Sequence, residues 1–332
     1  MANIIRFKPL FEDSPWLMLP NQYHSEQHHH TNFSTTSELG WRTWLGMSVC
    51  GDVEKKCIKK CFLNVSTNQV HSLALPEDAR GKTICGFSAG WLILLDHRNS
   101  SLTLLNPFTG HRINNLPQLP ENGAVHKAVL STDPLRNPRD YKVLAILGEK
   151  RKLLCYEDGD KQWTMLQDYG TYYDDVLAPT DEELVAVSEL GSLVCCDSPN
   201  RNQLVPPCFF NGGKVYLMSL GGEIYMLKSF SGTNYFLRHE GQWYVDNLGR
   251  FEVYRYDERH WCRTKDLGKW TIFLGHNHSV AAFKALDFRV NCIYFTDDEG
   301  GVDNSGVFSL RDGEAERKQW FMPSTAGKVV IQ

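Results

Sequence analysis

The stretch Phe288–Leu310, FRVNCIYFTDDEGGVDNSGVFSL, predicts the fold more clearly than any other part of the chain. Cys292–Thr296 and Gly306–Leu310 consist mainly of β-branched, aromatic and other apolar residues, which favour strands. The segment between them is acidic and rich in Gly and Asn, as turns are. The stretch is therefore interpreted as a β-hairpin. Because two strands alone bury too little surface to be stable, the hairpin must belong to a larger sheet.

Short strand-like segments, separated by Gly, Pro, Asn and Asp, continue in both directions from this hairpin and fill most of the chain from Lys60 onward. No segment has a helical apolar period longer than about ten residues. The segments fall into sets of four. One set is His126–Thr132, Tyr141–Leu147, Lys152–Tyr156 and Gln162–Leu166. Another is Lys214–Ser219, Glu223–Lys228, Gln242–Val245 and Phe251–Asp257.

These sets recur roughly every 45–50 residues, and a four-stranded repeat of that length is typical of a β-propeller. We therefore expect an all-β propeller of about six four-stranded blades, with seven possible; two packed β-sandwiches are the rival architecture. The expected division is an irregular segment over 1–56, the propeller over 57–323 and a tail over 324–332. One strand of the first segment, near Trp16–Leu19, is expected to contribute to closing the ring.

The composition and charge of the chain limit the functional classes of protein to which it can belong. The 332 residues carry a formal net charge of −4, whereas a general nucleic-acid binder needs a concentrated basic face. Several of the ten cysteines lie in apolar strand-like runs, where a free thiol behaves as a small apolar group, so disulfides are not expected. The chain shows no secretory signal and no apolar run of membrane-spanning length. A cytoplasmic or nuclear protein without nucleic-acid or membrane partners is expected.

Five pieces, in order along the chain, resemble the plant F-box-associated family called domain of unknown function 295. They are Pro15–Pro20 (PWLMLP), Gly90–Leu92 followed by Leu104–Gly110 (LLNPFTG), Gly275–Ser279 (GHNHS), Asn291–Asp298 (NCIYFTDD) and Gly306–Leu310 (GVFSL). Each piece is short, but their common order across residues 15–323 makes the resemblance fairly specific.

The resemblance implies a kelch-like or propeller-like C-terminal domain. In many family members this domain follows an F-box, which docks onto a Skp–cullin–F-box ubiquitin ligase, and the propeller holds the protein to be ubiquitinated. An F-box needs a helical, Leu-rich segment, and none is recognisable in this sequence. A Skp adaptor is therefore an expected partner only if an F-box exists outside this chain.

Several groups of residues resemble reactive or metal-binding sites, but ordinary structural roles explain them better. The histidines His24 and His28–His30, the pair Cys57 and Cys61, and the acidic run Asp297–Glu299 with Asp303 all lack a complete ligand spacing. Asp174–Asp175 and Asp181–Glu183 resemble the paired carboxylates of glycosidases but are expected in turns. No catalytic, cofactor-binding or metal-binding residue is predicted, and no cofactor is expected.

The function expected from the sequence is a non-enzymatic propeller that binds a protein partner of unknown identity. The candidate contact residues are Trp41 and Trp44, because Trp is frequent at binding hot spots, and His276 and His278, in a polar loop at the mouth of the ring. One alternative is a scaffold or decoy protein without an F-box. A second alternative is a hydrolase with its site in the central channel.

Overall fold

The computed structural model describes thirteen stretches of the chain. They are residues 16–18, 59–64, 69–166, 171–180, 183–196, 202–208, 213–230, 234–237, 243–246, 250–275, 279–285, 287–295 and 305–317.

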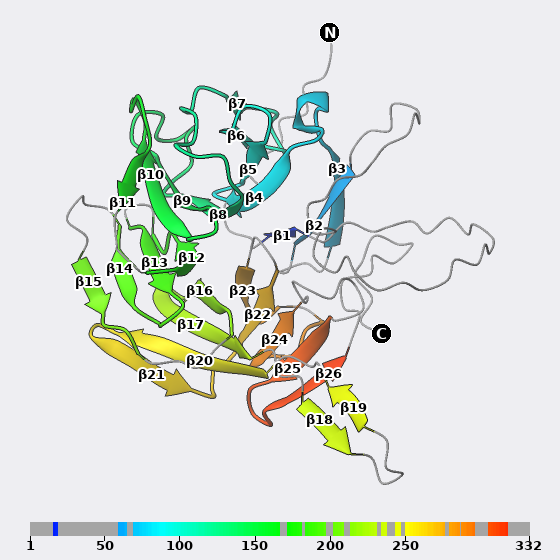
Figure 1. The fold of residues 1–332 in the computed structure, drawn as a ribbon. Coiled ribbons are helices and arrows are strands. Elements are labelled where there is room, and N and C mark those ends of the chain that lie inside the picture. The colour runs from blue at the N-terminus through cyan, green and yellow to red at the C-terminus, as the bar shows by residue number, and fades with distance from the viewer. Residues whose placement is uncertain are drawn as a thin grey trace, which may run out of the picture.

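Five sheets of four or five strands form the blades of a β-propeller, arranged around a ring (Figure 1). The first blade contains β4 (Thr83–Ser88), β5 (Trp91–Asp96), β6 (Ser101–Leu105) and β7 (Arg112–Ile113). The second contains β8 (Val125–Leu130), β9 (Lys142–Leu147), β10 (Lys152–Glu157) and β11 (Thr164–Leu166). The third contains β12 (Tyr173–Leu177), β13 (Val185–Ser188), β14 (Leu193–Cys195) and β15 (Asn202–Val205).

The last two blades are less regular. The fourth contains β16 (Val215–Leu220), β17 (Glu223–Phe230), β20 (Arg250–Asp257) and β21 (His260–Thr264). The fifth contains β22 (Trp270–Leu274), β23 (Ser279–Phe283), β24 (Cys292–Phe295), β25 (Gly306–Ser309) and β26 (Glu314–Arg317). Two smaller sheets are described beside them, β1 (Trp16–Met18) with β2 (Lys59–Asn64) and β3 (Gln69–Ala74), and β18 (Asn234–Leu237) with β19 (Trp243–Asp246).

The all-β propeller is confirmed, but the predicted number of blades is wrong: the described residues form five blades rather than about six or seven. One cause is the hairpin β18–β19, which is inserted between β17 and β20 and pairs with neither. The sequence pattern predicts a blade strand at Gln242–Val245 instead. Another cause is the fifth blade, where five consecutive strand-like segments form a single sheet.

The fifth blade also departs from sequential strand order, because its order is β23-β22-β24-β25-β26. The predicted hairpin is present, with Cys292 opposite Ser309 and Phe295 opposite Gly306 in antiparallel register. On its other edge, however, β24 pairs with β22 in parallel, with Ile272 opposite Ile293. A run of apolar residues predicts a strand but does not specify its neighbour, which is why this crossover was missed.

The apolar core is divided into layers between successive blades. A large cluster fills the space between the first and second blades, and further clusters separate the second from the third, the third from the fourth and the fourth from the fifth. Middle strands are therefore covered on both faces: all of Trp91–Leu95 and Val143–Leu147 is buried. This explains why these strands read as continuous apolar runs rather than alternating ones.

The innermost strands of successive blades lie side by side: β4 beside β8, β8 beside β12, β12 beside β16, and β16 beside β23. Strand β1 lies beside β23 as well, next to its own partner β2. Three inner strands carry a β-bulge at one residue, Cys85, His126 or Asp174, against the next strand of the same blade. A bulge bends the strand and redirects a side chain, and at Asp174 the redirected side chain reaches Val215 of the next blade.

Two hydrogen bonds tie the first blade to the second at the same sequence separation. Ser88 Oγ donates to the carbonyl of Leu130 over 3.2 Å, and the Trp91 indole N–H donates to Asp133 Oδ1 over 2.8 Å. Both bonds join residues 42 positions apart. The inner strands begin 42 residues apart from β4 to β8 and from β12 to β16, and 48 residues apart from β8 to β12, so the predicted period of 45–50 residues holds for one of these three repeats.

Gly86 marks the closest approach between two inner strands. A Cβ atom at this position would lie 2.0 Å from the carbonyl oxygen of Ala128 on β8. Replacing Gly86 with alanine must therefore push the first two blades apart, and we expect it to lower the free energy of unfolding by about 3 kcal/mol. Chemical denaturation of purified protein measures this difference.

Gly81 provides the matched control, because a Cβ there meets no heavy atom within 4 Å although its φ is +76°. Gly81→Ala should cost about 1 kcal/mol, from backbone strain alone. Equal losses for the two variants would contradict the close packing of β4 on β8.

Two expectations from the sequence concern the state of the cysteines and the presence of membrane-spanning segments. The seven cysteines among the described residues are free thiols: Cys85, Cys155, Cys195, Cys196, Cys208, Cys262 and Cys292. In the described part of the chain, no helix has the length and apolar character needed to cross a membrane.

Candidate partner-binding site

A cleft of about 430 Å³ lies between the fourth and fifth blades, close to the ends of β20, β21 and β25. It is lined by Phe230, Arg250, Phe251, Glu252, Val253, Arg263, Thr264, Lys265, Phe308, Leu310 and Gly313. The lining therefore combines side chains from three strands of one blade with side chains from the next. Clefts of this size, mainly apolar with a few polar groups, are the usual form of binding sites in proteins.

The apolar part of the cleft continues into the core. Phe251 is buried, and its ring centroid lies 5.1 Å from that of Phe295 and 5.5 Å from that of Phe308. Tilted and edge-on contacts at such distances are favourable for aromatic pairs. Because these rings also hold the fourth blade against the fifth, the floor of the cleft is rigidly supported.

The rim of the cleft is positively charged. Arg250, Arg263 and Lys265 are exposed, while Glu252 is the acidic residue of the lining; three positive charges and one negative give a net charge of +2. Arg263 Nη2 lies 2.6 Å from Glu252 Oε1, and the Tyr254 hydroxyl donates to Glu252 Oε2 over 2.7 Å. No ion pair involving Arg250 or Lys265 is found within the described residues.

Strand β20 produces this combination by simple alternation. Its side chains alternate between outward and inward, so that Arg250 is exposed, Phe251 buried, Glu252 half-buried and Val253 buried. Phe251 and Val253 thus complete the aromatic layer, whereas Arg250 and Glu252 project from the other face of the strand and line the cleft at its edge. This site could not be predicted from the sequence, because its residues come from segments about 10 to 80 positions apart and only the pairing of strands and blades brings them together.

Two adjacent carboxylates occupy the innermost strand of the third blade. Asp174 and Asp175 were expected in a turn, but they lie in β12 and are buried. The bulge at Asp174 lets both side chains reach the neighbouring blade, where Asp174 Oδ2 accepts the N–H of Val215 over 3.0 Å and Asp175 Oδ2 accepts that of Leu217 over 2.8 Å.

The second blade supplies a cation for each of these carboxylates. Arg151 pairs with Asp174 and Lys127 pairs with Asp175. Burial raises the pKa of the Asp174 carboxyl, and the Val215 N–H and the Arg151 guanidinium oppose that rise. The pair therefore joins three successive blades. With its oxygens already bonded to the protein, it is unsuited to the glycosidase role considered from the sequence.

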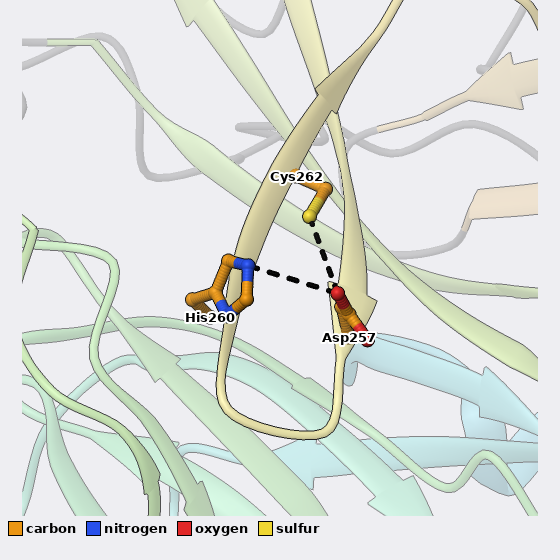
Figure 2. Close-up of side chains that lie close together, drawn as sticks. All are labelled: Asp257, His260 and Cys262. Carbon is orange, nitrogen blue, oxygen red and sulfur yellow. Dashed lines mark hydrogen bonds and ion pairs between the residues drawn. The ribbon is translucent and has the colours of Figure 1, made fainter.

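A third group of polar side chains gathers on the hairpin β20–β21, where Asp257, His260 and Cys262 point toward one another (Figure 2). Asp257 Oδ2 lies 3.6 Å from His260 Nε2 and 3.6 Å from Cys262 Sγ. Burial and the Asp257 carboxylate raise the pKa of the Cys262 thiol. The side chain therefore holds its proton and is a poor nucleophile as it stands.

The contact residues predicted from the sequence, Trp41, Trp44, His276 and His278, lie outside the described residues and stay predictions. The metal candidates at His24, His28–His30 and Asp297–Glu299 lie outside them too. Ser279, which follows the predicted histidines, is described at the start of β23.

Comparison with protein families agrees with the ring of blades. A family model described as KIB1-4 beta-propeller matches residues 62–309, which is most of the chain. The chain belongs to this family. A plant F-box-associated propeller, implied by the resemblance in the sequence, is supported at this level, whereas the specific label of domain 295 stays a prediction.

Curated relatives of this KIB1-4 propeller are F-box proteins of Arabidopsis thaliana. F-box protein SKIP23 is 29% identical over 238 residues, which cover 64% of this chain and 58% of the relative. Putative F-box protein At5g55150 is 28% identical over 258 residues, covering 71% of this chain and 68% of the relative. F-box/kelch-repeat protein At3g18720 is 24% identical and is covered over 36% of its length. The chain thus spans little more than half the length of SKIP23.

Solved structures match this chain with low sequence identity and low TM-scores. A puromycin-hydrolysing peptidase of Mycobacterium tuberculosis is 13% identical with a TM-score of 0.39, and the match covers 72% of this chain and 46% of the peptidase. A nidogen/laminin complex is 12% identical with a TM-score of 0.33, covering 61% of this chain and 73% of the matched chain. At these scores the likenesses add nothing to the functional argument.

Proposed function

We propose that this KIB1-4 propeller is a non-enzymatic recognition domain that binds a protein partner in the cleft between its fourth and fifth blades. The observation that carries the proposal is the pairing of an aromatic floor with a rim of net charge +2. This chemistry suits a partner segment that presents an apolar or aromatic side chain flanked by Asp or Glu. The predicted residues Trp41, Trp44, His276 and His278 are proposed as further contacts.

The biological context proposed for this binding is selection of proteins for ubiquitination. The support is the set of relatives, which are named as F-box proteins, and the resemblance of the sequence to F-box-associated domains. In this context the propeller holds the protein to be modified, and an F-box docks onto a Skp adaptor.

Reversing charge at the rim tests the cleft. We expect a chain carrying Arg250→Glu and Lys265→Glu to bind its partners at least about tenfold more weakly, because two attractive contacts become repulsive. Affinity capture from a plant extract, quantified by mass spectrometry for the wild-type and the variant chain, identifies the proteins that depend on the cleft. Binding constants of those proteins, once purified, then give the loss directly.

Arg98→Glu with Lys150→Glu is the matched control, because these exposed residues lie on the first and second blades and change the net charge equally. The control should capture the same proteins as the wild type. If both double variants lose the same proteins, or neither loses any, the cleft is not the binding site.

The scaffold or decoy alternative differs in its relation to the ligase. Purified Skp adaptor, mixed with the full-length protein, distinguishes the two roles: stable association supports substrate selection, and its absence favours the scaffold. Neither result affects the cleft itself, which the charge-reversal variants test independently.

A further inference from the structure

The hairpin β20–β21 places three different metal-ligating side chains on one face. Asp257 is directly opposite His260 in the antiparallel register, and Cys262 follows His260 by two residues. Because residues two apart in a strand share a face, all three side chains point the same way, as Figure 2 shows. Tyr256 and Trp261 point to the other face, where their rings pack at 5.9 Å within the apolar layer between the third and fourth blades.

Anchoring of the opposite face fixes the backbone that carries the three ligands. Trp261, which lies between His260 and Cys262, is buried and donates its indole N–H to the carbonyl of Gly191 over 2.8 Å. This bond joins the hairpin to the turn between β13 and β14 of the third blade. The ligands thus stand on a held strand pair rather than on a free loop, although their own side chains are accessible.

The distances between the ligand atoms of the cluster are close to the distances between ligand atoms around a bound transition metal. With Zn–S near 2.3 Å and Zn–N or Zn–O near 2.0–2.1 Å, tetrahedral coordination places ligand atoms about 3.3–3.6 Å apart. Asp257 Oδ2 is 3.6 Å from both the imidazole nitrogen and the thiol sulfur, and all three atoms lie within 4.8 Å of one another. A side-chain adjustment of about 1 Å at exposed His260 completes the geometry.

The donor set selects the kind of metal. Calcium and magnesium prefer oxygen ligands throughout, whereas a thiolate, an imidazole and a carboxylate together suit Zn²⁺ and similar borderline-soft cations. Arg255 is the cross-strand partner of Cys262 and shares its face, but its guanidinium is held 3.2 Å from Glu223 Oε1. That carboxylate offsets its repulsion of a cation.

We propose that Asp257, His260 and Cys262 bind a Zn²⁺ ion at the outer surface of the fourth blade, with a fourth coordination position open to solvent. The bond formed is between the thiolate sulfur and the metal, and the bond broken is S–H: one proton leaves Cys262 to solvent for each Zn²⁺ bound, with no change of oxidation state. An open fourth position accepts water or a donor from a bound molecule.

Cobalt substitution tests the proposal on the full chain. After chelator treatment, titration with Co²⁺ should produce a near-ultraviolet thiolate-to-cobalt charge-transfer band that saturates at one equivalent and disappears when Zn²⁺ is added. Cys262→Ser should abolish the band, and Asp257→Asn and His260→Gln should each weaken Co²⁺ binding at least about tenfold. Circular dichroism and thermal unfolding of each variant show whether its fold is retained.

Two matched variants keep the test specific. Cys208→Ser removes another half-exposed thiol, and Glu258→Gln removes a charge from the same turn without removing a ligand. Both should bind Co²⁺ as the wild type does. As an independent measurement, mass spectrometry should show that Zn²⁺ slows alkylation of Cys262 but not of Cys208. The absence of a band at one equivalent, a band that survives Cys262→Ser, or equal protection of the two thiols would overturn the proposal.

Discussion

Replacing Asp175 with alanine is expected to lower the free energy of unfolding by about 3–5 kcal/mol. The side chain of Asp175 is 2% exposed and that of its partner Lys127 is 12% exposed, so the variant leaves a nearly buried ammonium without its counter-ion. It also removes the acceptor for the Leu217 N–H on the next blade. Denaturant unfolding measures the loss.

Two further variants separate this contact from a general effect of removing charge. Glu223→Ala breaks an exposed pair with Arg255, and because water solvates both partners we expect a change of at most about 1 kcal/mol. In the double variant Lys127→Met with Asp175→Leu, no buried charge remains unpaired, so its loss should be smaller than that of Asp175→Ala. A loss near zero for Asp175→Ala would show that the three-blade contact does not stabilise the ring.

Truncating Trp261 is expected to have an effect of similar size, about 3–5 kcal/mol for Trp261→Ala. Trp261 fills the layer between the third and fourth blades, where its neighbours include Val187, Leu217 and Met226. Its indole N–H donates to the carbonyl of Gly191, so alanine leaves both a cavity and an unsatisfied acceptor. The measurement is again the free energy of unfolding from denaturant titration.

The variant Trp261→Phe separates the contribution of the hydrogen bond from the contribution of the buried apolar volume. Phenylalanine keeps most of the apolar volume and loses the hydrogen bond, so we expect a loss of about 1–2 kcal/mol. Equal losses for the phenylalanine and alanine variants would place all of the stabilisation in the hydrogen bond. Losses below about 1 kcal/mol for both would contradict the role of Trp261 in holding the two blades together.

The class of fold could be predicted from the sequence because its signal is local. The runs Trp91–Leu95 and Val143–Leu147 indicate buried strands, and turn residues punctuate them at regular spacing. The number of blades could not be predicted, since it depends on which strands pair. Nothing local in the segment Gln242–Val245 shows that it joins β18 instead of β17, or that β24 lies parallel to β22.

The candidate sites depend even more than the number of blades on contacts between segments that are distant in the sequence. Arg250, Lys265 and Phe308 line one cleft only because the fourth and fifth blades meet there. The acidic pair Asp174–Asp175 was noticed in the sequence, but its partners Lys127, Val215 and Leu217 lie about 40 to 50 residues away. By contrast, Asp257, His260 and Cys262 lie within six residues and became a candidate metal site only once the register of the hairpin was known.

Amide hydrogen exchange with and without a bound partner tests the central claim most directly. For a partner identified by capture and then purified, slower exchange should be confined to residues 250–253, 263–265 and 308–313, the segments that contribute most of the cleft lining. The first and second blades should exchange equally in both states. Protection that maps to those two blades, with the cleft unchanged, would contradict binding between the fourth and fifth blades.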